Sequence, residues 1–274
     1  MTTLDLTREA TAHLVDLSGP VLTRAERVLV ESTWRGRMAN EYASARVFAG
    51  LVPQLMRAQL SAAKIADLAT FVADELSHAQ QCAGVLVSLA ARPVAELPTL
   101  DDIPTHTDCG PIEGALRNVL SICCLSETVA VSLINAERIE QAESPIGDVL
   151  QRILADEVKH ARFGWKLLED LEIDAAMKAN LSRYLHVAFA HLERHELEHL
   201  SPLPAPTNAM AYGACDGALA RDIFFSTIEE VIVPRLEQHG FDARTAWQER
   251  SFTAPAPAAA PSEAAPNRTS ARAL

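Results

Sequence analysis

The chain contains one seven-residue pattern twice, as ADELSHA at residues 73–79 and as ADEVKHA at residues 155–161. In a helix, a glutamate and a histidine three residues apart lie on one face, about one turn from each other. Two such pairs, each joined by a glutamate from a neighbouring helix, are what a carboxylate-bridged dimetal site in a four-helix bundle requires. The repeated motif therefore predicts an all-α protein with a metal centre, provided that two partner glutamates are present.

Both motifs interrupt the apolar face of a predicted helix. Burying unpaired carboxylates and imidazoles in a core would be costly, and a bound cation removes that cost. A third E-x-x-H, Glu196 with His199, lies instead in the polar run HLERHELEHL at a helix end, where we interpret it as a solvated face. Apolar residues recur with helical spacing around the first motif at Leu68, Phe71, Cys82, Val85 and Leu89, and around the second at Leu150, Ile153, Leu167 and Leu171.

The two preceding helices each carry one glutamate where the apolar spacing calls for an aliphatic residue. Glu41 precedes Glu75 by 34 residues, and Glu127 precedes Glu157 by 30 residues. These separations place each glutamate level with its motif on an antiparallel neighbour. Taken singly, a glutamate on such an apolar face can pair with Arg37, and a histidine there can be a hydrogen-bonded core residue. Together they predict one cluster of metal ligands at mid-bundle, here called the six-residue cluster: Glu41, Glu75, His78, Glu127, Glu157 and His160.

The rest of the chain reads as helices separated by proline-rich and glycine-rich loops, with no strand. Long helices are predicted at 23–51, 61–91, 111–141 and 144–171, and the loop 92–111 crosses between the two pairs. A short helix is predicted at 4–17. Further helices at 175–200 and 216–237 complete one domain over residues 1–250, whose core bundle is 23–171 and whose extra helices lie within 175–250. Residues 251–274 form an Ala/Pro-rich tail that we expect to be disordered.

Composition restricts the possible partners and location. The net charge of −12 argues against nucleic acid and against an anionic membrane surface, because both require a basic face. No apolar run approaches the length of a membrane span, and the N-terminus has no signal-peptide pattern. The five cysteines show no C-x-x-C spacing, so we expect reduced thiols in a cytoplasmic protein.

The two D-E-x-x-H motifs and their partner glutamates resemble the ferritin-like di-iron carboxylate superfamily, which includes rubrerythrins and ribonucleotide reductase small subunits. The resemblance covers residues 23–171 and implies an antiparallel four-helix bundle with a long crossover between the helix pairs. It also implies that Glu75 and Glu157 bridge two metal ions. Glu41 and His78 would then cap one of the two metals, and Glu127 and His160 would cap the other.

The aspartates that precede the motif glutamates have an implied role as well. A metal-bound imidazole needs an acceptor for its second N–H group. By the resemblance, Asp156 would orient His78 and Asp74 would orient His160. Placement at an exposed helix position is the alternative for both aspartates.

The resemblance implies two iron ions, and the oxygen and imidazole ligands suit manganese or a mixed pair equally. We expect a non-haem di-iron oxidoreductase that uses O2 on a small organic substrate. A rubredoxin-like cysteine set is missing, and Ile153 stands where the arylamine N-oxygenases have an extra histidine. A ferroxidase or peroxide-scavenging protein without an organic substrate is the first alternative, and a non-catalytic helical scaffold is the second. The electron donor is unspecified and a homodimer is left open.

Two further expectations concern the C-terminal helices. A stripe of histidines at residues 191, 195 and 199 is interpreted as a solvated face in preference to a surface metal site. Apolar residues of the last long helix are expected to wall a substrate pocket beside the metals; they are Phe224, Phe225, Ile228, Val231 and Ile232.

Overall fold

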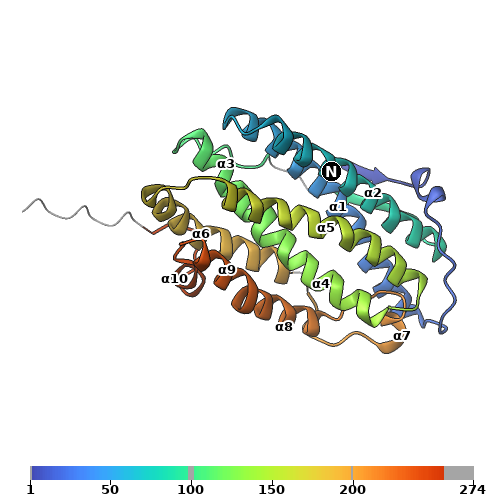
Figure 1. Ribbon diagram of the computed structural model, residues 1–274. Helices are drawn as coiled ribbons and strands as arrows, with labels where there is room; N and C mark the ends of the chain where they lie inside the picture. Colours follow the sequence, from blue (N-terminus) through green and yellow to red (C-terminus); the bar gives the residue numbers. More distant parts are fainter. Residues whose placement is uncertain (1, 98–101, 199, 256–274) are drawn as a thin grey trace, which may run out of the picture.

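The computed structural model describes residues 2–97, 102–198 and 200–255, and it is mostly helical (Figure 1). The prediction of an all-α fold is therefore confirmed at the level of class. Most of the predicted disordered tail, from residue 256 onward, lies outside the described residues. The longer helices are α1 (Arg24–Arg57), α2 (Ala62–Ser88), α3 (Pro111–Val119), α4 (Glu127–Glu140), α5 (Pro145–Asp170), α6 (Ala175–Leu197) and α8 (Gly217–Thr227).

Local sequence signals account for where the long helices begin. The hydroxyl of Thr23 accepts a hydrogen bond from the backbone of Glu26, whose carboxylate in turn accepts one from the backbone of Thr23. This reciprocal capping box satisfies N–H groups that have no partner inside the helix. Ser61 and Ser144 cap α2 and α5 more simply, because each hydroxyl accepts one hydrogen bond from a backbone N–H in the first turn of its helix.

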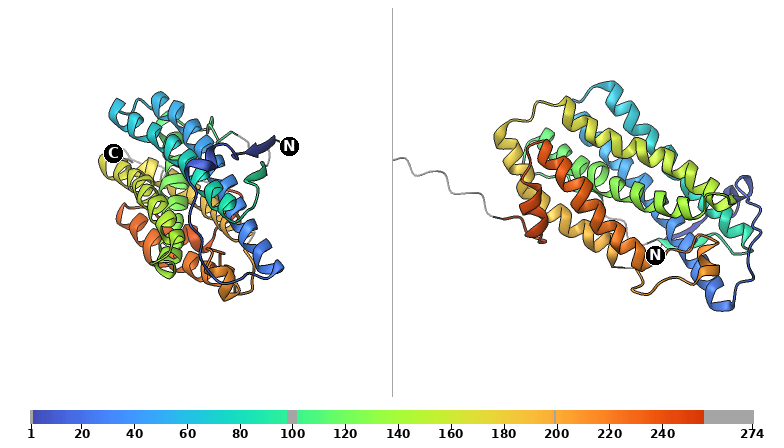
Figure 2. Two further views of the ribbon diagram at one scale, coloured as in Figure 1. Left: turned by 90° about the vertical axis from the view of Figure 1, so that its right-hand side faces the viewer. Right: turned by 60° about the horizontal axis from the view of Figure 1, so that its bottom comes forward.

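The helices pair in the order in which they follow along the chain. α1 packs along α2, α4 packs along α5, and α2 lies beside α5 (Figures 1 and 2). The segment that joins α2 to α3 starts near the beginning of α1, where Arg27 donates a hydrogen bond to the carbonyl of Leu89. It ends near the far end of α1, where the amide of Gln54 donates to the carbonyl of Pro104. α3 and α4 therefore run antiparallel to α1.

Two groups of buried apolar residues lie on either side of the polar motifs. On α1, one group contains Trp34 and Met38 and the other contains Phe48 and Leu51, so that Glu41 lies between them. α2 and α5 show the same arrangement, because apolar residues of one group precede each motif and residues of the other group follow it. The six-residue cluster is thus enclosed by apolar packing at both ends.

The predicted helix 111–141 contains a π-helical segment, η2 (Leu120–Ser126), between α3 and α4. η2 ends directly before Glu127. Because a π-turn holds more residues than an α-turn, η2 rotates the side chains of α4 about the helix axis relative to those of α3. α5 approaches η2 closely at Gly164, where a Cβ atom would lie 2.6 Å from Cβ of Cys123 and 2.9 Å from Sγ of Cys124. π-Bulges inside α-helices frequently occur at functional sites.

Replacing Gly164 by alanine is expected to destabilise the protein by about 1–3 kcal/mol, because the added methyl group overpacks this contact. Gly36 is a matched helical control, since nothing lies within 4 Å of a Cβ atom built there. Gly36→Ala is expected to stabilise α1 slightly, because alanine favours a helix interior by about 0.5–1 kcal/mol. Urea unfolding of both variants measures the difference, and an equal change in the two would contradict the close approach.

The N-terminal prediction was wrong. Residues 4–17 do not form one helix: β1 (Thr2–Asp5) pairs antiparallel with β2 (Val94–Leu97), and a short 3₁₀ turn covers Glu9–Ala12. The expectation of no strand is corrected by the same pair. Leu4 is buried between exposed neighbours, as a half-buried strand requires, but four residues are too few to distinguish this alternation from helical spacing.

Several helix ends also differ from the prediction. α1 continues to Arg57 through Pro53, because burial of Leu51 and Leu55 outweighs the one hydrogen bond that the proline removes. The helix predicted at 216–237 consists of α8, the π segment η3 (Ile228–Ile232) and α9 (Val233–Gln238). Two short helices, α7 (Thr207–Met210) and α10 (Ala243–Gln248), were not predicted.

One helical stretch of the described residues, Pro111–Glu140, is long and apolar enough by composition to cross a membrane. This stretch corrects the expectation that no apolar run approaches the length of a membrane span. It packs against α5 and carries the buried side chains of Glu113 and Glu127. Core helices pass the same test of length and composition, so the stretch is weak support for a membrane span.

Candidate metal centre

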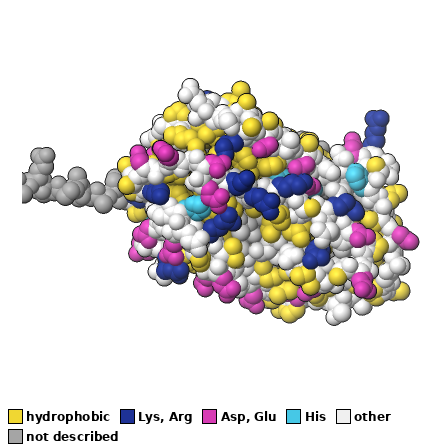
Figure 3. All heavy atoms as spheres, viewed as in Figure 1, with side chains coloured by type: hydrophobic (Ala, Val, Ile, Leu, Met, Phe, Trp, Pro, Cys, Tyr) yellow, Lys and Arg dark blue, Asp and Glu magenta, His cyan; other side chains and the backbone are white. Residues whose placement is uncertain are grey.

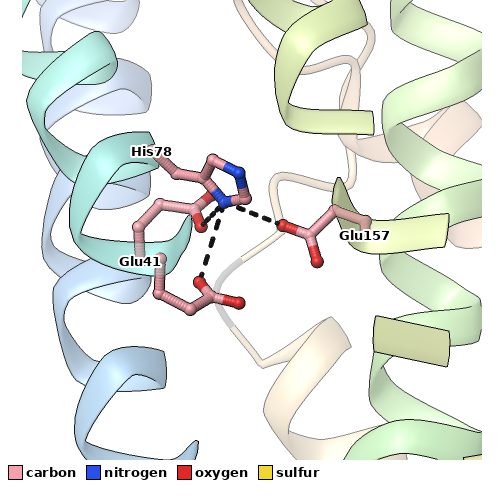
Figure 4. Close-up of side chains that lie close together, drawn as sticks. Glu41, His78 and Glu157 are labelled. Atoms are coloured by element: carbon pink, nitrogen blue, oxygen red, sulfur yellow. Dashed lines mark ion pairs between the residues drawn. The ribbon is translucent and has the colours of Figure 1, made fainter. Parts of the chain in front are cut away.

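The first half of the site is built around His78 of α2. Its Nδ1 atom lies 3.2 Å from a carboxylate oxygen of Glu157, 3.4 Å from one of Glu41 and 3.9 Å from one of Glu75. Figure 4 shows the carboxylates of Glu41 and Glu157 pointing toward this nitrogen from α1 and α5. Three helices thus converge on one ring nitrogen.

The second half is built around His160 of α5 and mirrors the first. Its Nδ1 atom lies 3.1 Å from Glu157, 3.2 Å from Glu75 and 3.8 Å from Glu127. Glu75 and Glu157 therefore contact both histidines, whereas Glu41 and Glu127 each contact one. All six predicted ligands lie together in two overlapping groups of four side chains, each able to hold a metal ion.

The cluster is buried, and its side chains shift one another's pKa values. Burial raises the pKa of Glu75 to about 9, with repulsion from Glu157 adding to it. Burial by itself would lower the pKa of His78, but the carboxylates of Glu157 and Glu41 outweigh it and raise that pKa to about 11. The same opposition raises the pKa of His160 to about 12. Without a metal ion, positive charge on the two histidines balances part of the carboxylate charge.

The chemistry of these side chains fits a metal ion better than protons. Nδ1 of His78 is buried and, among the described residues, has no geometrically acceptable hydrogen-bond partner, although three carboxylates lie within 3.9 Å. An imidazole nitrogen surrounded by carboxylate oxygens is a ligand set for iron, manganese or zinc. The buried cluster can therefore hold a metal ion.

The second nitrogen of each imidazole faces a half-exposed aspartate. Nε2 of His78 lies 3.3 Å from Asp156, and Nε2 of His160 lies 3.4 Å from Asp74. Each aspartate belongs to the other motif's helix, so the two motifs contact each other reciprocally. These contacts fix the ring orientations in the way that outer carboxylates orient metal-bound histidines. Asp156 also accepts a hydrogen bond of 2.6 Å from Nζ of Lys159.

A cavity of about 530 Å³ lies between α1 and α4 and reaches the cluster at Glu41, Glu75, Glu127 and Glu157. We call it the α1–α4 cavity. Its α1 side includes the small residues Gly36 and Ser44, and its α4 side includes the larger apolar residues Leu133 and Ile134. The lining residues used below are Gly36, Asn40, Ser126, Ala130, Leu133 and Ile134.

The prediction that apolar residues of the last long helix form the wall of a pocket beside the cluster was wrong. Phe224, Ile228 and Ile232 are fully buried in the core, where Phe224 packs against Trp247. Phe225 is half-buried against the same core, and Val231 is exposed. They do not line the α1–α4 cavity. Apolar spacing along the last helix identifies a buried face, but it does not distinguish a packed core from the wall of a cavity.

The sequence did not predict that Arg37 and Glu196 line the α1–α4 cavity. Arg37 forms an ion pair of 2.5 Å with Glu137 of α4, and not with one of the glutamates that interrupt the apolar helix faces. Glu196, from the third E-x-x-H, lies 3.5 Å from the hydroxyl of Ser126, and burial raises its pKa. The solvated-face prediction holds for the exposed His191 and His195, whereas Glu196 is half-buried. His199 lies outside the described residues.

Comparisons of the chain with protein-family models, with curated proteins and with solved structures found no match.

Proposed function

We propose that the protein is an O2-activating dimetal oxidoreductase with the ferritin-like bundle and crossover that its motifs resemble. Glu75 and Glu157 would each reach both metal ions, because each contacts both histidines. Glu41 with His78 and Glu127 with His160 would complete the two coordination spheres. Two ferrous ions bound there would supply electrons to O2. The proposal places the protein in the cytoplasm, where its free cysteines stay reduced.

The side chains would hold this centre by charge and by orientation. Four carboxylates carry four negative charges, which balance two divalent cations and so lower the cost of burying them. Asp74 and Asp156 would keep each imidazole with its Nδ1 atom directed inward. The apolar groups above and below the cluster shield its two ends from water.

The α1–α4 cavity is the observation that favours oxidation of an organic substrate over ferroxidase work. Its volume of about 530 Å³ is in the range of small-molecule sites. Leu133 and Ile134 offer apolar contact, while Asn40 and Ser126 offer hydrogen bonds. A bound molecule would lie directly beside Glu41 and Glu127. Storage or simple oxidation of iron does not require such a chamber.

The test is O2 consumption by protein loaded anaerobically with two ferrous ions, with and without a panel of small organic compounds. Ala130→Leu, which fills the cavity, is expected to slow product formation at least tenfold while two metal ions per chain are retained. Ala136→Leu on the same helix, outside the cavity, is the matched control.

Other outcomes would identify the alternatives. Rapid, repeated iron oxidation without an organic co-substrate, unchanged by Ala130→Leu, would replace the proposal with a ferroxidase. Turnover of hydrogen peroxide alone would indicate a peroxide scavenger. Failure to bind any metal would leave a helical scaffold.

A further inference from the structure

A stripe of basic side chains runs along the outward face of α5. Arg152, Lys159, Arg162 and Lys166 are all exposed. Their spacings of seven, three and four residues place them on one side of the helix, over about 21 Å. Figure 3 shows Lys and Arg side chains gathered across the middle of this face, where Figure 1 places α5. The stripe is unexpected in a chain with a net charge of −12.

The stripe is connected to the six-residue cluster through a single side chain, that of Asp156. α5 itself carries Glu157 and His160 on its inward face. From the stripe, Lys159 contacts Asp156 at 2.6 Å, and Asp156 lies 3.3 Å from Nε2 of His78. A single half-exposed carboxylate therefore separates the surface from a candidate ligand.

The stripe and the cavity occupy different edges of the helix arrangement. The α1–α4 cavity opens between α1 and α4, and Asp74 and Asp156 lie where α2 meets α5. A partner on α5 would thus leave the cavity free for a substrate. No ion pair joins Arg162 or Lys166 to a carboxylate of the described residues, so both charges are available.

The proposed chemistry requires electrons from outside. Reduction of O2 to two molecules of water, or to one water and one inserted oxygen atom, takes four electrons in total. A two-electron oxidation of the organic substrate supplies only two of them. The remaining two must come from a reductant, either as two one-electron transfers from two reduced carriers or as a pair.

We propose that the α5 stripe is the docking surface for a small acidic one-electron carrier protein, an inference that rests on the proposed function. Two reduced carriers, each giving up one electron, return the oxidised centre to its reduced state and leave as two oxidised carriers. Charge complementarity selects an acidic partner, and a weak, salt-sensitive complex suits repeated docking. The compact stripe ends at Asp148 and Asp170, which limits it to a small footprint and disfavours a long polyanion.

The test measures binding of an oxidised acidic plant-type ferredoxin to the full chain by calorimetry, at low salt and at 0.5 M salt. Arg162→Glu with Lys166→Glu is expected to weaken binding at least tenfold. Arg46→Glu with Arg244→Glu reverses two exposed arginines elsewhere and changes the net charge equally. This control pair is expected to leave the affinity within about twofold.

Binding is measured on metal-free and metal-loaded protein, and reduction of the loaded protein is followed separately with dithionite and with reduced ferredoxin. The stripe variant should lose ferredoxin reduction and keep dithionite reduction. Equal effects of both charge reversals, or no salt-sensitive binding at all, would overturn the docking surface even if the metal chemistry holds. Absence of a metal centre would refute the proposed function while the binding result on metal-free protein still stood.

Discussion

Replacing Glu157 by alanine is expected to abolish metal binding at the six-residue cluster, so that the metal content of the loaded protein falls to none after desalting. Glu157 lies 3.2 Å from Nδ1 of His78 and 3.1 Å from Nδ1 of His160, and it belongs to both groups of candidate ligands. Its removal takes one ligand from both groups at once, and with it the single negative charge that the two groups share. Glu75→Ala is expected to behave alike for the same reason. Elemental analysis after anaerobic loading measures the loss.

Glu196→Gln is the matched control, because Glu196 is a half-buried carboxylate that lines the same cavity but belongs to neither ligand group. It is expected to retain the metal content of the unsubstituted protein. Circular dichroism of each metal-free variant checks that the helices still form. Full metal content in Glu157→Ala, or an equal loss in Glu196→Gln, would mean that the cavity's general acidity binds cations and that the six-residue cluster does not.

The long helices could be predicted from the sequence because their signals are local. Thr23, Ser61 and Ser144 cap helices within three residues of themselves, and the apolar spacing continues over many turns. The meeting of the six side chains could be anticipated for a related reason. Each glutamate or histidine interrupts an apolar face, and a buried charged group requires a partner.

Features that depend on distant contacts could not be predicted. β1 and β2 pair residues such as Leu4 and Ala95, which are far apart in the chain, and neither four-residue strand has a visible period. The π segment η2 lies in the apolar run LSICCLS, where every residue is buried or half-buried. Spacing in such a run does not distinguish 3.6 residues per turn from the wider π-turn.

The cavity was missed for a different reason. On its α1 side, Gly36 and Asn40 are small or polar residues that read as an ordinary solvated helix face. A cavity arises where facing side chains are too small to meet, and that depends on both helices together. Phe224 and Ile228 were assigned to its wall because they are apolar, but large apolar residues fill space instead of leaving it.

A rise in pH from 6 to 9 is expected to lower the stability of the metal-free protein and to increase the stabilisation given by a divalent metal. The folded state raises the pKa of His78 to about 11 and that of His160 to about 12, because carboxylates surround both rings. The stability that these protons contribute is fully present below the unfolded pKa of about 6.5. It is lost as the pH rises toward the folded values, by about 1.4 kcal/mol per pH unit for each proton that only the folded state retains.

Glu75 acts in the same direction, because burial raises its pKa to about 9 and the folded protein keeps a proton that the unfolded chain releases near pH 4.5. A metal ion must displace these protons, so its affinity rises about tenfold per pH unit for each proton released. Calorimetric melting temperatures at pH 6, 7.5 and 9, with EDTA and with Mn²⁺, measure both trends without oxidation of the metal. Glu157→Ala removes a carboxylate from both rings and should flatten the two pH dependences. A metal-free protein that gains stability between pH 6 and 9 would contradict the protonated histidine pair.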